Sequence, residues 1–344
     1  MKPNRERSGI LAAGNWIIDR VKVIDAYPGE ESLALISEEQ SSNGGSPYNL
    51  LKDLRRLGAP FPLQGAGLLA EDELGRSIRA DCDEEGIDTS RFHWTREAPT
   101  SYTDVYTVSS TGRRTFFHQK GTNALLDTGH CSLESSSAKI FHLGYLMLLD
   151  RLDRIDADGR TGASRLFETA SRKGFLVSAD LVSSESEEFC RVVRPSLPSI
   201  DIFFANDLEV ERVSGIGIRR DGQLIPSGVE EAGRWLIENG IRRYACIHFR
   251  EGAYVCAADG KTFWQASVNV PAERIAGSVG AGDALAAGML FGIHEGWKIK
   301  DSLRLGVFAA ASCLLHPASS LGVLPRGECF QLAEEWGFAG MQGD

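Results

Sequence analysis

The sequence predicts an α/β protein in which helices cover both faces of a mostly parallel β-sheet, with a smaller β-sheet set apart from it. The main observation is that short apolar runs alternate with longer segments of helical period between residues 140 and 257, as in successive β-α units. Residues 102–118 interrupt this pattern with two strand-like runs around a Ser-Ser-Thr-Gly turn, which predicts an antiparallel hairpin. The 344 residues contain no internal repeat or long linker, so we expect a single domain over 9–338.

The first third of the chain is expected to supply one strand of the main sheet, two helices and part of the small sheet. The apolar run 10–13 predicts the first strand. Ser46 and Pro47 suit the N-cap and the first position of the following helix. A second helix is expected over 72–85. A ribbon over 16–40 is expected to join the hairpin in the small sheet.

The remaining elements alternate and then become helical. Strands are expected over 140–143, 175–180, 201–205, 243–249 and 253–257, and helices over 161–173, from Asn206, and over 229–238, 281–296, 301–315 and 328–336. The most apolar long window, 275–293, carries Asp283 at its middle, and a charge there is costly in a bilayer. We therefore expect a buried helix there, and a disordered, polar N-terminus over residues 1–8 without a targeting segment.

Composition excludes several classes of function. The chain has 37 Lys and Arg against 47 Asp and Glu, a net charge of −10, and no basic stretch, which argues against nucleic acid or an anionic membrane as partner. Its seven cysteines are scattered with no C-x-x-C pair, which indicates reduced thiols in the cytoplasm. The seven histidines form no cluster with zinc-ligand spacing.

The strongest candidate for chemistry is Gly280-Ala281-Gly282-Asp283 at the start of an apolar helix. Glycines at a helix start let backbone N–H groups converge on an anion, and the helix dipole adds partial positive charge there. Asp283, at the same end, could accept a proton from a substrate hydroxyl, and the pair would suit phosphoryl transfer to an alcohol. The alternative is a glycine-rich helix entry in which Asp283 only complements the dipole.

A second candidate is the segment from Gly44-Gly45 to Asn49. The two glycines allow close approach of a ligand, and Asn49 offers both a donor and an acceptor to a hydroxyl. Asp19, just after the first strand, could bind two neighbouring hydroxyls. An ordinary loop-to-helix junction and a turn-forming aspartate are the competing interpretations.

A third candidate is Asn206-Asp207-Leu208-Glu209 after an apolar strand. Oxygen donors at the carboxyl end of a strand can hold waters around Mg²⁺. The spacing N-x-x-E is also that of a capping box, and spacing alone favours the cap.

The sequence also argues against a Rossmann dehydrogenase and against a hydrolase with a nucleophile elbow. Residues 65–70, G-A-G-L-L-A, match the dinucleotide fingerprint. However, Pro60 and Pro62 interrupt the strand it would need, and acidic residues follow where a pyrophosphate would lie, so a Rossmann dehydrogenase is rejected. The G-x-S-x-G nucleophile elbow is absent.

Taken in order, these segments resemble the ribokinase-like (PfkB) carbohydrate kinase family over nearly the whole chain. The resemblance rests on Gly14 to Asp19, Gly44-Gly45 to Asn49, His118 to Asn123 with Gly121 between them, Asn206 and Glu209, Gly280-Ala281-Gly282-Asp283, and Ala309-Ala310-Ala311 with Gly322-Val323. It implies a three-layer αβα ribokinase-like core with a mostly parallel sheet. A small β-sheet lid, contributed by about residues 16–40 and 98–120, would close over a sugar-like alcohol. Lid sheets of this family often pair between subunits, so a homodimer through the lid is expected.

The resemblance also implies ATP and Mg²⁺ as cofactors and a role for each matching residue. Asp283 would be the catalytic base, and the Gly280, Ala281 and Gly282 amides would stabilise the transferring phosphoryl group. The expected substrate-binding residues are Asp19, Gly44, Gly45, Asn49, His118 and Asn123, the expected nucleotide contacts are Asn206, Arg250, Gly252, Gly282 and Ala310, and Asn206 and Glu209 would organise Mg²⁺ through water.

Three departures from the family pattern stand out. Gly277-Ser278-Val279 replaces the usual Asp-Thr, which counts against activation by a monovalent cation. The nucleotide loop over 247–252 keeps only its final glycine, with Arg250 as a substitute charge. The segment His142 to Tyr145 lacks an acidic residue that ribokinases have there, so ribose is not favoured as the substrate.

The expected function is therefore ATP-dependent phosphorylation of a hydroxyl of a sugar or sugar-like polyol. Two alternatives remain: a nucleoside kinase of the same fold, and a catalytically silent sugar-binding regulatory protein.

Overall fold

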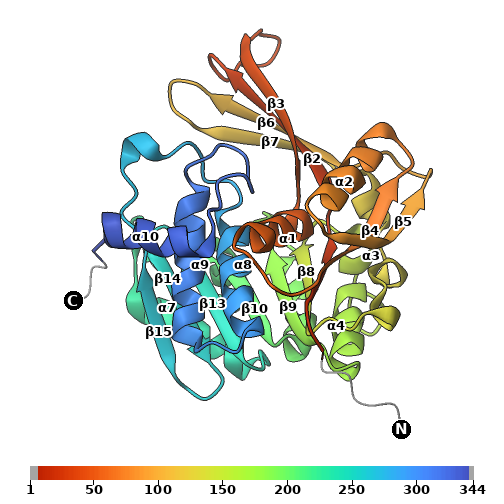
Figure 1. Ribbon diagram of the computed structural model, residues 1–344, viewed down its shortest axis with the longest axis vertical. Coiled ribbons are helices and arrows are strands. Elements are labelled where there is room, and N and C mark those ends of the chain that lie inside the picture. The colour runs from red at the N-terminus through yellow and green to blue at the C-terminus, as the bar shows by residue number, and fades with distance from the viewer. Residues whose placement is uncertain (1–6, 341–344) are drawn as a thin grey trace.

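Nine strands form the central sheet, which helices cover on both faces (Figure 1). The structure, a computed structural model, describes residues 7–340. From edge to edge the strands are β15 (Thr262–Ala266), β14 (Gly252–Ala257), β13 (Tyr244–Phe249), β10 (Ile202–Asn206), β9 (Leu176–Leu181), β8 (Ile140–Leu146), β1 (Ile10–Gly14), β4 (Leu63–Ala70) and β5 (Asp88–Thr95). All neighbours from β13 to β5 pair in parallel, and β14 and β15 are antiparallel. Because the strands run in parallel, their carboxyl ends share one edge, where ligand sites of such sheets lie.

The two faces of the sheet have separate hydrophobic cores. Along β1, Ile10 and Ala12 belong to one core and Leu11 and Ala13 to the other, as the alternation of side chains along a strand requires. The first core is shared with α1 (Ser46–Arg56), α2 (Glu73–Glu84), α8 (Ala281–His294), α9 (Ile299–Cys313) and α10 (Arg326–Trp336), and the second with α3 (Asp150–Asp153), α4 (Gly162–Arg172), α5 (Phe189–Val193), α6 (Asp207–Ser214) and α7 (Pro226–Glu238).

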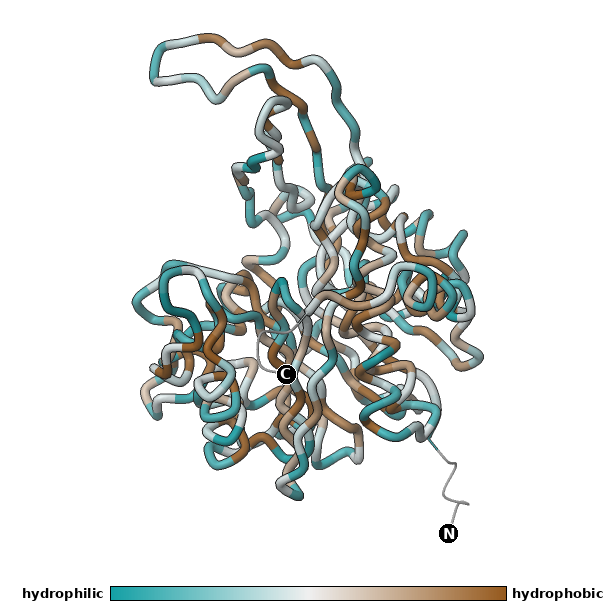
Figure 2. The backbone as a smooth tube through the Cα atoms, turned by 90° about the vertical axis from the view of Figure 1, so that its left-hand side faces the viewer, coloured by the Kyte–Doolittle hydropathy of each residue, from teal (hydrophilic) through white to brown (hydrophobic). Residues whose placement is uncertain are grey.

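A four-stranded sheet stands apart from this body and forms the lid. Its strands, in the order β3, β2, β6, β7, are β3 (Ile36–Gly44), β2 (Ile17–Ile24), β6 (Tyr102–Val108) and β7 (Arg114–Gln119). The central pair β2 and β6 is parallel, and the outer pairs are antiparallel. Figure 2 shows the lid as an arm that rises from the body. The predicted αβα fold with a small second sheet is confirmed.

Some local predictions need correction. The N-cap of α1 is Gly45, not Ser46. Gly45 has a φ of 92°, a left-handed conformation that favours glycine, and the Ser46 hydroxyl bonds to His142 Nε2 instead of capping the helix. Residues 65–70, where a dinucleotide-binding loop was rejected, lie inside β4, a strand that was not predicted. An ideal Cβ on Gly67 would lie 2.5 Å from Trp16 Nε1, so packing of the indole accounts for that glycine.

The expectation of a disordered N-terminus concerns residues 1–8, of which 1–6 lie outside the described residues. Arg7 donates hydrogen bonds to three backbone carbonyl oxygens, and the Ser8 amide donates to a fourth. Within 7–340, no helix is both long and apolar enough to cross a membrane.

Candidate active site

The start of α8 brings Asp283 into the interior at the carboxyl edge of the sheet. Gly280 caps the helix with a φ of 84°, and an ideal Cβ there would lie 2.1 Å from the Ser319 carbonyl oxygen. A side chain at this position is therefore excluded both by conformation and by space. Along its length α8 packs closely on α9, since an ideal Cβ on Gly288 would lie 2.7 Å from the Gly306 Cα. The first turn of α8 is thereby fixed with Asp283 buried.

Two donors hold the same oxygen of the Asp283 carboxylate. Asn49 Nδ2 donates to Oδ2 at 2.9 Å, and the Tyr145 hydroxyl donates to Oδ2 at 2.6 Å. The other oxygen, Oδ1, is buried and has no hydrogen-bond partner. Burial raises the pKa of Asp283 to about 6, and the bonds from Tyr145 and Asn49 oppose this rise. Oδ1 is thus the oxygen available to accept a proton.

Asn49 is itself held in one orientation. The Ser319 hydroxyl donates to Asn49 Oδ1 at 2.8 Å, which directs Nδ2 toward Asp283. Asn49 lies in the first turn of α1, so the same helix start that contains Gly45 also delivers this amide. Ser319 follows α9 and was not predicted from the sequence.

Asp19 on β2 faces the same space as Asp283. Burial raises the pKa of Asp19 to about 7, and the charge of Asp283 adds to this rise. An ideal Cβ on Gly44 would lie 2.1 Å from Asp19 Oδ2, so a glycine at 44 leaves room for this carboxylate. The structure therefore brings together Asp19, Gly44, Asn49 and Asp283 from three separate segments.

His118 and Asn123, which are also predicted to contact the substrate, each have a buried side-chain nitrogen without a hydrogen-bond partner. His118 on β7 pairs through Nδ1 with the Thr103 hydroxyl at 2.9 Å, and its Nε2 is buried without a partner. Asn123 is buried and accepts from the Trp16 amide through Oδ1 at 3.3 Å, while its Nδ2 has no partner. Asn123 thus fixes the backbone next to the first strand, and its contact with a substrate stays a prediction.

Tyr145 and Asp180 belong to the site although the sequence analysis did not assign them. Tyr145 lies in β8, in the segment noted for lacking an acidic residue, and supplies a donor to Asp283 instead. Asp180 is buried near the end of β9, and its pKa is raised by burial and then by the charges of Asp283 and Glu209. An aspartate that ends an apolar strand is the sequence signal that would have indicated it.

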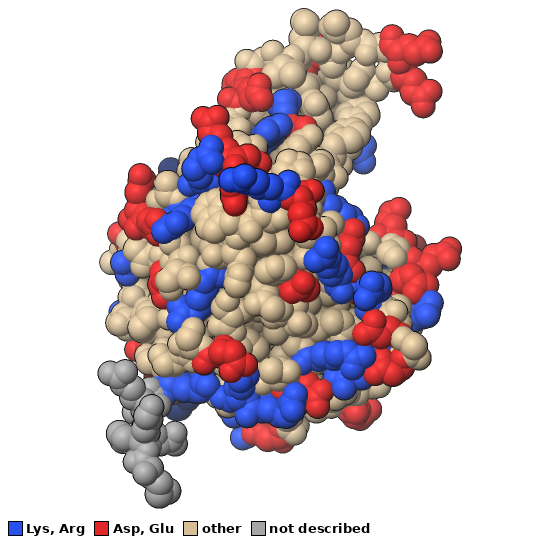
Figure 3. Space-filling view, turned by 90° about the vertical axis from the view of Figure 1, so that its right-hand side faces the viewer, with Lys and Arg blue, Asp and Glu red and all other residues tan. Residues whose placement is uncertain are grey.

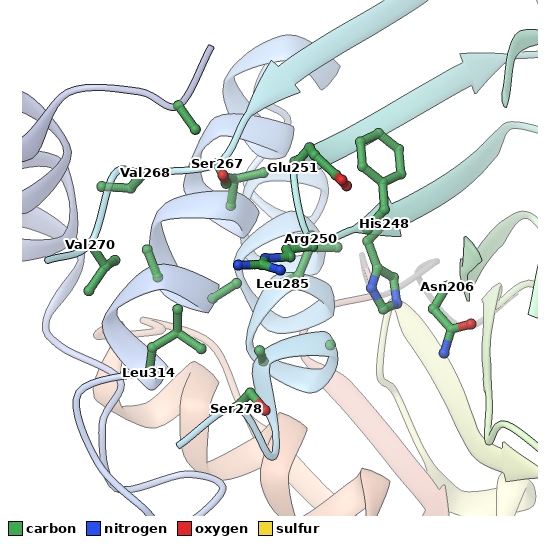
Figure 4. A pocket seen from close by; sticks show the side chains of 18 of the residues that line it. Asn206, His248, Arg250, Glu251, Ser267, Val268, Val270, Ser278, Leu285 and Leu314 are labelled. Atoms are coloured by element: carbon green, nitrogen blue, oxygen red, sulfur yellow. The ribbon is translucent and has the colours of Figure 1, made fainter. Parts of the chain in front are cut away.

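A cavity of about 840 Å³ opens beside the first turn of α8. The residues that line it include all five predicted to contact the nucleotide: Asn206, Arg250, Gly252, Gly282 and Ala310. Figure 4 shows Arg250 over the middle of the cavity, with Asn206 and His248 on one side and Ser278 and Leu314 on the other. Since Ala281 and Gly282 line the cavity and Asp283 follows directly in the same helical turn, a ligand here would lie next to the base.

The turn that carries Arg250 is tied to α6. Arg219 forms ion pairs with Asp207 on α6 and with Glu251 in the turn. These two ion pairs fix the altered loop at the edge of the cavity.

Asn206 and Glu209 form a capping box at the start of α6. The Glu209 amide donates to Asn206 Oδ1, and the Asn206 amide donates to Glu209 Oε2. Glu209 Oε1 accepts from Ser183 and from Asn206 Nδ2, and burial raises the pKa of Glu209 to about 7. The cap inferred from spacing is therefore present. Within the described part of the chain, no group of three or more His, Cys, Asp or Glu residues could hold a metal ion directly.

These features define an α/β enzyme fold with a lid, a buried carboxylate at a helix start and an adjoining cavity. Residues 9–325 match the pfkB family carbohydrate kinase, so the chain belongs to this family of phosphotransferases that act on an alcohol group.

Relatives and solved structures agree with this assignment. A 5-dehydro-2-deoxygluconokinase of Clostridium beijerinckii is 25% identical over 276 residues, covering 78% of this chain and 77% of the relative. The ketohexokinase of Mus musculus is 26% identical over 306 residues, covering 88% of this chain and 94% of the relative. The Arabidopsis thaliana ribokinase structure with ribose and ATP superposes with a TM-score of 0.75 at 19% identity, covering 97% and 100%. A nucleoside kinase of Methanocaldococcus jannaschii has a TM-score of 0.72 at 14% identity, covering 96% and 99%.

Proposed function

We propose that this protein transfers the terminal phosphoryl group of ATP to a hydroxyl of a sugar or sugar-like polyol, with Asp283 as general base. The observation that carries the proposal is the unpartnered Oδ1 of Asp283, buried in the same first turn of α8 whose residues Ala281 and Gly282 line the 840 Å³ cavity. Such a carboxylate can take the hydroxyl proton as the oxygen attacks phosphorus.

The surrounding groups have complementary tasks. The amides of Gly280, Ala281 and Gly282 start α8, where the helix dipole favours negative charge, and they would stabilise the transferring phosphoryl group. Asp19 and Asn49 would hold neighbouring substrate hydroxyls. The proton passes from the hydroxyl to Asp283 Oδ1, the O–P bond to the acceptor forms, and the bond to the ADP oxygen breaks.

The nucleotide would occupy the cavity between α6, α8 and α9. Gly252 lines this cavity, the small side chain of Ala310 leaves space for the nucleotide, and Arg250 supplies positive charge in the altered loop. Mg²⁺ would sit near Asn206 and Glu209 and be reached through water, because both side chains already bond to each other. The oxygen donors at this strand end suit such an ion, which would neutralise phosphate charge.

Two other functions remain as alternatives. A nucleoside kinase is supported by the similar archaeal nucleoside kinase structure. A silent sugar-binding protein is supported by the altered loop over 247–252, although the intact arrangement around Asp283 argues against it.

One experiment separates the three functions. ADP release is measured with ATP and a panel of acceptors that includes 5-dehydro-2-deoxygluconate, ketohexoses, other sugars and polyols, and nucleosides. Turnover with a sugar or polyol supports the proposal, turnover with nucleosides alone supports the first alternative, and ligand-induced stabilisation without turnover supports the second.

Substitution of the base tests the mechanism. Asp283→Asn should lower kcat by about a thousandfold or more while folding and ATP affinity stay near normal, because only proton acceptance is removed. Asp301→Asn, the same change in the first turn of α9, is the matched control and should keep full activity. Near-normal turnover of Asp283→Asn would refute the assignment.

Two properties of the whole protein extend the proposal. A homodimer through the lid is supported by apolar side chains exposed on it, among them Leu33, Leu35, Phe116 and Phe117. All seven cysteines are free thiols, which accords with the predicted cytoplasmic location.

A further inference from the structure

A second cavity, of about 630 Å³, lies at the amino edge of the central sheet. Tyr244, which begins β13, and Ala257, which ends the antiparallel strand β14, both line it. His248, near the other end of β13, lines the nucleotide cavity instead. No residue of the described chain lines both cavities. The second cavity is therefore separate from the candidate active site, which lies at the carboxyl edge of the sheet.

The lining of this second cavity is strongly cationic, although the chain has a net charge of −10. We call the cavity the basic pocket. Its lining residues come from the segment before β13, the turn between β14 and β15, the start of β15 and the start of α9. One acidic residue, Asp259, lies among five Lys and Arg residues: Arg242, Arg243, Lys261, Lys298 and Lys300. A concave concentration of positive charge attracts anions.

Two of these lysines have no partner in the described part of the chain. Lys298 and Lys300 are exposed, and neither ammonium group forms an ion pair or a hydrogen bond there. Arg243 and Lys261 each have a carboxylate within ion-pair distance. Arg242 donates hydrogen bonds to a backbone carbonyl and to a serine hydroxyl, which hold its guanidinium in place. The basic pocket thus offers two unpaired ammonium groups and an oriented guanidinium.

The first turn of α9 adds backbone donors to the basic pocket. Lys298 is the N-cap of this 15-residue helix and makes no side-chain hydrogen bond to it, and Ile299 and Lys300 also line the pocket. The first amides of a helix have no acceptor within the helix, and the helix dipole favours negative charge beside them. Free amides together with cationic side chains are suited to binding phosphate oxygens.

Apolar side chains also line the basic pocket. Tyr244, Phe263 and Ile299 are half-buried and pack against the hydrophobic core that includes α8 and α9. A volume of about 630 Å³ is in the range of small-molecule sites. A long polyanion would extend beyond the pocket over a molecule of net negative charge, which disfavours it. The pocket is therefore suited to a compact anion.

We propose that the basic pocket binds a small molecule that carries two or more phosphate groups, at a site separate from the catalytic centre. Lys298, Lys300 and the α9 amides would bind one phosphate group, and Arg242 with Arg243 would bind another, because these donors come from two different parts of the lining. The proposal is independent of the proposed function, since no residue of the basic pocket is assigned to catalysis or to the nucleotide.

Calorimetry on the full-length protein tests this proposal. Fructose 1,6-bisphosphate and inorganic tripolyphosphate are each titrated into the parent protein and into the double variant Lys298→Gln with Lys300→Gln. The measurement is made at about 0.1 M ionic strength, where charges outside the pocket are largely screened. We expect the double variant to bind these anions at least about 10-fold more weakly, because two charge-assisted contacts are lost. The nucleotide cavity is the same in both proteins, so anion binding there contributes equally to the two titrations.

The two anions distinguish the source of the phosphate. Tighter binding of fructose 1,6-bisphosphate would identify a phosphorylated metabolite whose carbon skeleton contacts the apolar lining. Tighter binding of tripolyphosphate would identify an inorganic polyphosphate. Either result supports the proposal when the lysine variant loses the affinity.

Arg212→Gln with Arg220→Gln is the matched control. Both arginines are exposed, line neither cavity and have no side-chain hydrogen bond or ion pair in the described structure, so this double substitution removes the same net charge. It should bind both anions within about twofold of the parent. The proposal is wrong if the parent binds neither anion, if the lysine variant binds both as tightly as the parent, or if the control loses as much affinity as the lysine variant.

Discussion

Asp283 receives two hydrogen bonds on one carboxylate oxygen, and this arrangement controls the pH at which the base is available. Burial favours the protonated form of the group, whereas donors to the ionised form favour loss of the proton. With the pKa raised to about 6, the base form still dominates at pH 7. Tyr145 and Asn49 are therefore positioning residues whose effect is measurable as a shift in a pH profile.

The pH dependence of turnover follows from the raised pKa of Asp283. In the parent protein kcat/KM should fall as the pH drops through about 6, because Asp283 becomes protonated and cannot accept the hydroxyl proton. Tyr145→Phe removes a donor to the ionised form, so the pKa of Asp283 rises and the acidic limb moves to higher pH. Rate profiles between pH 5 and 9 measure this, with Tyr244→Phe as control. An unmoved limb, or one displaced to lower pH, would contradict the assigned role of Tyr145.

At the scale of a single element, α1 contains a buried carboxylic acid that has no hydrogen-bond partner in the described structure. Asp53 is fully buried one turn after Asn49, and both of its oxygens lack a hydrogen-bond partner. Burial and the charge of Asp283 raise its pKa well above the usual range. The folded environment therefore favours the neutral form of Asp53.

Replacement of this acid should change how stability depends on pH. Because the folded-state pKa is raised, the contribution of Asp53 is fully present below its unfolded pKa and is lost as the pH rises through the folded value. The stability of Asp53→Asn relative to the parent should thus increase with pH, by about 1 kcal/mol or more between pH 5 and pH 9, measured by thermal unfolding. The exposed Glu84→Gln on α2 should leave the difference between the two pH values unchanged. A variant less stable than the parent at pH 9 would show that Asp53 has a stabilising partner.

The elements that the sequence predicts well are those with a strong local pattern. The helical periods of 72–85 and 301–315 reappear in α2 and α9 within two residues. The strands β5 and β15 were not predicted, because they lie at or near the sheet edges and carry many polar or half-buried residues, so their alternation is weak. Where Gly45 rather than Ser46 caps α1, a long-range bond to His142 outweighs the local preference.

The residues of the candidate site also differ in whether a local sequence pattern indicates them. Asp283, Asn49 and Asp19 follow glycines or strand ends, and such local signals are visible in one sequence. Tyr145 and Ser319 have no such signal, since each reaches the site from a distant segment and is defined only by the atom it contacts. Tertiary packing alone brings these two side chains to Asp283 and Asn49.

At the scale of the whole molecule, the lid exposes apolar side chains on an otherwise charged surface. Six of the large hydrophobic residues that are half exposed or more belong to the lid or its connecting loop: Tyr27, Leu33, Leu35, Ile36, Phe116 and Phe117. Figure 3 shows charged side chains spread over the body, while much of the projecting lid on that side is uncharged. The outer lid strands β3 and β7 also leave unpaired edges. Exposed edges and apolar patches of this kind favour association.

A second copy of the chain is the partner that this surface predicts. Light scattering during gel filtration should give twice the 37.5 kDa of one chain at micromolar concentration. Leu33 and Leu35 are 82% and 65% exposed, so Leu33→Asp with Leu35→Asp should leave the fold intact and shift the mass to that of a monomer, because carboxylates are excluded from an apolar interface. Leu208→Asp places the same charge on an exposed leucine of α6, away from the lid, and should remain dimeric. A monomeric parent, or a dimer that survives the lid substitutions, would remove the lid from any role in assembly.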